Sequence, residues 1–79
     1  MEIRVNQQAK QKQLDEVVVA IINKAQGFAD MGIDQFVFNF PSGVNIYSAI
    51  IDVKKQTNET VYVPSRGISG KEVTFCIKD

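Results

Sequence analysis

The sequence contains no histidine, no tryptophan and a single cysteine, Cys76. Histidine is the commonest general base and the commonest zinc ligand, so its absence removes the usual basis for an enzyme active site or a zinc site. One cysteine cannot form an internal disulfide, and without histidine its thiol lacks the partner that commonly activates it. The acidic residues are scattered, with no metal-binding spacing. We therefore expect a protein that is not an enzyme and that uses no cofactor or metal.

Neither charge sign is in excess, because nine basic residues balance nine acidic ones. This balance argues against a protein whose main partner is a polyanion. The longest apolar run, residues 17–22, is far too short to cross a bilayer. The first residues also lack the apolar core of a signal peptide. We expect a cytoplasmic protein with no membrane partner.

The chain of 79 residues is 44% apolar and 23% charged, which is typical of one globular domain spanning residues 1–79. Residues 7–29 are rich in Gln, Lys and Ala, and Asn6 offers an N-cap, so we predict a long helix. Residues 2–5 alternate polar and apolar side chains, which predicts a short extra edge strand before the helix. The apolar residues of the helix recur three or four positions apart, on one face: Leu14, Val18, Ile21, Ala25 and Phe28.

Phe36, Phe38 and Phe40 occupy alternate positions of residues 34–40, so an extended strand places all three on one face. We predict further strands at residues 44–54, 59–63 and 72–78. The predicted fold is α+β, in the order β-α-β-β-β-β: one long N-terminal helix packed on one face of a four-stranded antiparallel sheet.

Two registers of the first hairpin lead to different cores, because a slip of one residue turns every side chain over. A three-residue loop at residues 41–43 pairs the Phe face with the face that carries Ser48 and Asp52. A loop of two or four residues pairs it with Tyr47 and Ile51, and we prefer this register because it keeps Asp52 out of the core. The predicted core is then Phe36, Phe38, Phe40, Tyr47, Ala49, Ile51, Val53, Val61, Val63, Val73, Phe75 and Ile77.

The loop at residues 65–71 combines two glycines, two hydroxyls and two cations, a composition that can grip a phosphate. It lacks the length and the following helix of a P-loop. The alternative interpretation is a connection between strands, with glycines that serve the turns. The candidate anion-binding residues are Ser65, Arg66, Gly67, Ser69 and Lys71.

One helix can cover only one face of the sheet, so several apolar side chains are expected on the other face. A contiguous apolar patch of this kind commonly marks a protein interface, and exposed strand edges offer a second route to association. The alternative is a solvated face with a few tolerated apolar residues. The predicted interface residues are Val37, Val44, Ile46, Ile50, Tyr62 and Cys76.

These observations favour a small non-enzymatic protein-binding module. A stand-alone regulator or inhibitor, of the kind that phages and mobile elements encode, fits this description. Its expected partner is another protein or a second copy in a homodimer. The alternative is a nucleic-acid or nucleotide-binding domain that uses residues 65–71 with Lys54 and Lys55. No stretch carries a motif specific enough to indicate a family.

Overall fold

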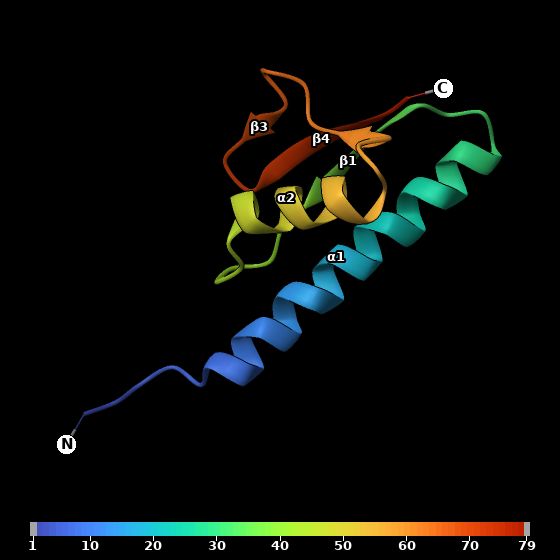
Figure 1. The fold of residues 1–79 in the computed structure, drawn as a ribbon. Helices are drawn as coiled ribbons and strands as arrows, with labels where there is room; N and C mark the ends of the chain where they lie inside the picture. Colours follow the sequence, from blue (N-terminus) through green and yellow to red (C-terminus); the bar gives the residue numbers. More distant parts are fainter. Residues whose placement is uncertain (1, 79) are drawn as a thin grey trace.

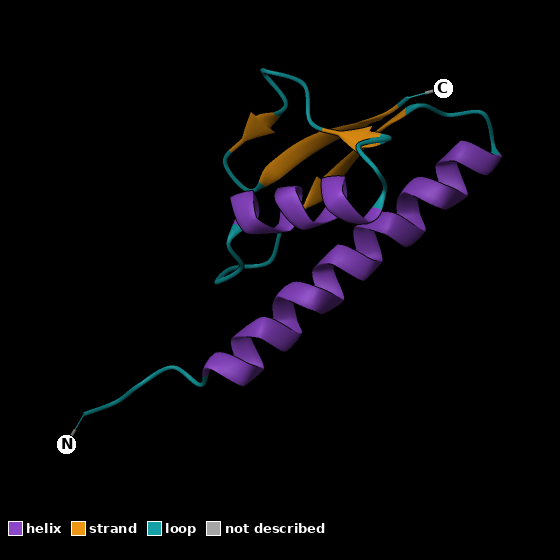
Figure 2. Ribbon diagram, in the orientation of Figure 1, coloured by secondary structure: helices purple, strands orange, loops and turns teal. Residues whose placement is uncertain are grey.

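A computed structural model describes residues 2–78, and Figure 1 shows two helices lying against one face of an antiparallel sheet. Figure 2 separates the helical layer from the strands by colour. The α+β class, the long helix ahead of the strands and the four-stranded antiparallel sheet are confirmed. The elements are α1 (Gln7–Asp30), β1 (Gln35–Asn39), α2 (Ile46–Gln56), β2 (Val61–Tyr62), β3 (Ile68–Ser69) and β4 (Glu72–Ile77).

Strand β4 is the centre of the sheet, because each of the other strands pairs with it. On one side β1 runs antiparallel to it, with Phe38 opposite Val73. On the other side, β3 pairs with the first residues of β4 and β2 pairs with its last residues. Ile68 of β3 therefore also lies opposite Val73. The β3–β4 turn begins at Gly70, whose φ of 61° suits glycine.

Helix α1 begins where predicted, because the Asn6 side chain accepts the backbone N–H groups of Gln8 and Ala9 at 2.9 and 3.1 Å. The first two turns, residues 7–13, are exposed, so this part of the helix extends beyond the body. The middle of α1 packs into the core through Val17, Val18, Ile21 and Ala25.

The prediction of a strand at residues 44–54 is wrong, and so are both hairpin registers built on it. Asn45 caps α2 by accepting the Ser48 N–H at 3.1 Å. The buried residues Ala49 and Val53, four positions apart, then lie on one helical face. Tyr47 and Ile51 were expected in the core and are instead exposed on the opposite side.

The predicted extra edge strand at residues 2–5 does not form. These residues belong to no helix or strand. The observed order is therefore α-β-α-β-β-β, and the segment before α1 extends away from the sheet (Figure 1).

Phenylalanines form the centre of the core. Phe75 on β4 is fully buried and stacks on Phe36 with ring centroids 5.5 Å apart. Phe36 in turn stacks on Phe28 of α1 at 5.4 Å. Phe38 lies at the margin, half-buried, beneath the ammonium group of Lys24. The fully formed core contains Val17, Val18, Ile21, Ala25, Phe36, Phe40, Ala49, Val53, Val61, Val73 and Phe75.

The two ring positions predict different losses of stability. Phe75→Ala leaves a cavity among stacked rings and should lower the free energy of unfolding by about 3–5 kcal/mol. Phe38→Ala removes a half-buried ring and should cost about 1–2 kcal/mol. Urea denaturation monitored by circular dichroism measures the free energy of unfolding of both variants. Equal losses in the two variants would contradict this placement of the core.

Candidate functional site

The six predicted interface residues do not form one surface. Val44, Ile46 and Ile50 are partly buried and pack against the core cluster. The predicted strand at residues 44–54 would have placed them on a free sheet face. Ile46 and Ile50 face the core from α2, and Val44 packs against it from the turn just before the helix, so the three do not form one patch with the other three.

The remaining three residues, Val37, Tyr62 and Cys76, lie on the sheet face opposite the helices. Tyr62 is directly across from Cys76, and the Lys78 ammonium nitrogen is 5.5 Å from the centre of the Tyr62 ring. Val37, the most exposed of the three, lies opposite Thr74. Polar residues interrupt the apolar ones on this face: Gln35, Asn39, Glu72 and Thr74. The face is mixed rather than a continuous apolar patch.

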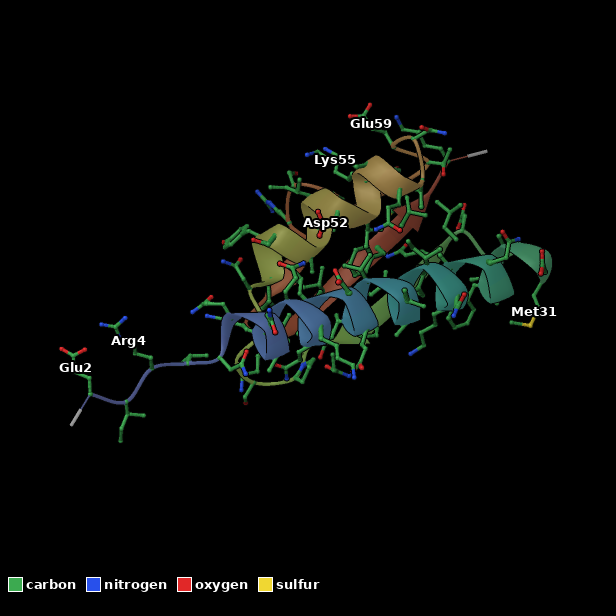
Figure 3. All side chains as sticks on the ribbon, turned by 60° about the horizontal axis from the view of Figure 1, so that its bottom comes forward. Glu2, Arg4, Met31, Asp52, Lys55 and Glu59 are labelled. Carbon is green, nitrogen blue, oxygen red and sulfur yellow. The ribbon has the colours of Figure 1, made fainter. Side chains whose placement is uncertain are left out.

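The most exposed apolar pair of the folded body lies on α2. Tyr47 is 69% exposed and Ile51 is 51% exposed, one helical turn apart on the side that faces solvent. Lys54 and Lys55 follow in the last turn and continue the same side of the helix. We call these four residues the α2 ridge. In Figure 3, Lys55 points away from α1.

The α2 ridge ends in a shallow hollow lined by Ile51, Lys54, Lys55 and Glu59. Glu59 lies beyond the end of α2, and Figure 3 places it at the same end as Lys55. The ridge therefore presents an aromatic ring, an aliphatic side chain and two cations in a row on a helix that is fixed to the core through its other face.

Sequence reasoning missed this surface, although a signal for it was present. Ile46, Ala49, Ile50 and Val53 follow the helical spacing of three and four, after an N-cap residue, Asn45. The spacing alone places these four on one side. It leaves Tyr47 and Ile51 as apolar residues on the other.

Several polar groups of the candidate anion-binding loop already form hydrogen bonds within the chain. The Gly67 N–H donates to the Pro64 carbonyl oxygen at 2.9 Å, and the Gly67 carbonyl accepts the Thr74 N–H at 2.8 Å. The Lys71 ammonium donates to the Ser42 hydroxyl at 2.6 Å. Ser65, Arg66 and Ser69 are exposed around this connection. The Gly67 N–H, a candidate donor to a phosphate, is thus used in the connection between strands β2 and β3.

Among the acidic and cysteine side chains of residues 2–78, no group of three or more is placed to hold a metal ion. Neither described helix is both long enough and apolar enough to cross a membrane.

Comparison with protein-family models, with curated proteins and with solved structures finds no match.

Two glycines in different surroundings, Gly67 in the loop and Gly27 on α1, predict opposite effects on stability when each is replaced by alanine. A Cβ at Gly67 would lie 2.8 Å from Val63 Cγ1 and 2.9 Å from the Thr74 carbonyl oxygen. Gly67→Ala should therefore destabilise the fold by about 1–3 kcal/mol. Gly27→Ala, in open space on α1, should stabilise it by about 0.5–1 kcal/mol. Thermal and urea unfolding of the two variants provides the measurement, and a neutral Gly67→Ala would contradict the close packing.

Proposed function

We propose that this protein is a small non-enzymatic protein-binding module, a stand-alone regulator or inhibitor, that engages its partner through the α2 ridge. The observation that carries the proposal is the exposure of Tyr47 and Ile51 side by side on one helix. Single exposed apolar residues are common on monomers and need no explanation. Two large ones one turn apart on the same helix are a more specific feature.

The residue types of the ridge suit an interface. Tyrosine is enriched among the residues that contribute most to binding, since its ring buries a large area and has few rotatable bonds. Ile51 is β-branched, so little side-chain entropy is lost when it is covered. The backbone of α2 is held by the buried residues Ala49 and Val53, so binding requires little ordering of the chain.

Charge indicates the chemistry of the partner. Within residues 2–78 the one ion pair joins Arg4 to Glu2, so Lys54 and Lys55 are not neutralised by a salt bridge inside the chain. A partner with an apolar groove for Tyr47 and Ile51 and with carboxylates at one end complements this arrangement. Such carboxylates steer association and fix the orientation of the complex.

The experiment is a comparative capture from cell lysate, followed by mass spectrometry and by binding measurements with each purified candidate. Tyr47→Ser combined with Ile51→Ser should weaken binding of a genuine partner about tenfold or more, which corresponds to about 1.4 kcal/mol. Lys54→Glu combined with Lys55→Glu should slow association and reduce its dependence on salt.

The matched control is Val19→Ser, which removes an apolar side chain of similar exposure (53%) from the outer side of α1. This control should bind as the wild type does. A partner that binds the ridge variant and the wild type equally, with both variants folded by circular dichroism, would refute the assignment of the ridge.

A further inference from the structure

The segment before α1 carries two apolar side chains that its own fold leaves uncovered. Ile3 is 92% exposed and Val5 is 67% exposed, and they alternate with Glu2 and Arg4. The Arg4 guanidinium donates to the Glu2 carboxylate at 2.8 Å, so these two polar side chains share one side of the segment. We call residues 2–5 the arm. Its apolar and polar sides are those of an amphipathic edge strand without a sheet.

Strand β1 has an open edge. Within residues 2–78 it pairs with β4 and with no other strand. Hydrogen bonds at the ends of this pair use even-numbered residues of the β1 side: the Phe40 N–H donates to the Lys71 carbonyl, and the Asp34 carbonyl accepts the Ile77 N–H. Because an antiparallel ladder alternates, the backbone groups of Gln35, Val37 and Asn39 point away from β4.

Strand β1 itself lacks two of the features that protect such edges from pairing. Its sequence, Gln-Phe-Val-Phe-Asn, contains no charged residue and no proline. On the helix-facing side of this edge, Phe38 is only half-buried. An added strand with apolar side chains on that side would complete its cover, and its backbone would satisfy the outward groups of β1.

We propose that the arm of one copy adds to the β1 edge of a second copy, so that two chains exchange arms in a homodimer. The arm supplies what the edge lacks: four extended residues with one apolar side. In an antiparallel register with Arg4 opposite Val37, Ile3 lies beside Phe38 and Val5 lies beside Phe36. The linked Glu2 and Arg4 side chains then lie on the solvent face of the sheet, with Gln35 and Asn39.

The direction of the arm favours a second copy over the arm's own sheet. The exposed first turns of α1 hold the arm beyond the body, and it continues away from β1 (Figure 1). The molecule is 53 Å long but only 21 by 18 Å across, largely because of this extension. An extended arm on a projecting helix is suited to exchange between protomers.

The first test is sedimentation equilibrium of the full chain from micromolar to millimolar concentration. The wild type should rise from the mass of one chain to twice that mass. Ile3→Asp combined with Val5→Asp should keep the single-chain mass throughout, with an unchanged circular dichroism spectrum, since the arm lies outside the core. The control Val19→Asp, on the exposed side of α1, should dimerise as the wild type does. A wild type that stays monomeric, or a dimer that survives the arm substitutions, would overturn the proposal.

Disulfide trapping separates exchange between copies from folding of the arm onto its own sheet. Arg4→Cys and Val37→Cys are combined with Cys76→Ser, so that the two new thiols are the only ones in the chain. Oxidation should give a covalent product of twice the chain mass. A cross-link within one chain, or none at concentrations where the wild type is dimeric, would also overturn it. The α2 ridge variants should leave the dimer intact, so failure here and failure of the proposed binding function are distinguishable.

Discussion

The stacking of Phe75 on Phe36 across the β4–β1 pair is the interaction on which the rest of the structure depends. Strand β4 is the one strand that contacts each of the others, and Phe75 is its fully buried centre. Phe36 also stacks on Phe28 of α1, and Phe40, just after β1, packs on Phe75. Rings from a helix and from both strands of a pair thus form one unit on one face of the sheet. The placement of α1 over β1 follows from this unit.

A chain of this size can cover only one face of its sheet. Both helices lie on the face that carries the phenylalanines, and the reverse face carries mixed residues such as Val37 and Thr74. A second consequence is that β1, which is placed at the end of the sheet by its pairing with β4, pairs with no strand on its other side within residues 2–78. Strands β2 and β3 are two residues each and leave little edge on theirs. The long, uncharged edge of β1 is therefore the strand edge best suited to association.

Much of the fold could be predicted from the sequence where local patterns and packing agree. Helix α1 is indicated by its N-cap, Asn6, and by the apolar face that includes Val18 and Ile21. Strand β1 is indicated by Phe36 and Phe38, which are two positions apart. The prediction for residues 44–54 was wrong because Tyr47 and Ile51, on the exposed side of α2, give the segment two apolar faces, as in a buried strand. Strand propensity reflects packing context, and in so short a segment the helical spacing of Ile46, Ala49, Ile50 and Val53 competes with an alternation that is apolar on both faces. The tertiary pairing of β4 with three strands was also not visible in local patterns.

Two of the wrong predictions, the strand at residues 44–54 and the edge strand at residues 2–5, fall on the two surfaces to which we assign association. Natural sequences tend to satisfy local rules except where another demand opposes them. Tyr47 breaks the amphipathic pattern of α2, and Ile3 gives the arm a strand pattern that no sheet of its own chain uses. Each places a large apolar side chain in water, which costs free energy that the isolated fold does not recover. A covering partner would recover it, and we propose that this partner is another protein on α2 and a second copy on the arm. The residues that the monomer explains least are thus the ones most simply explained by a complex.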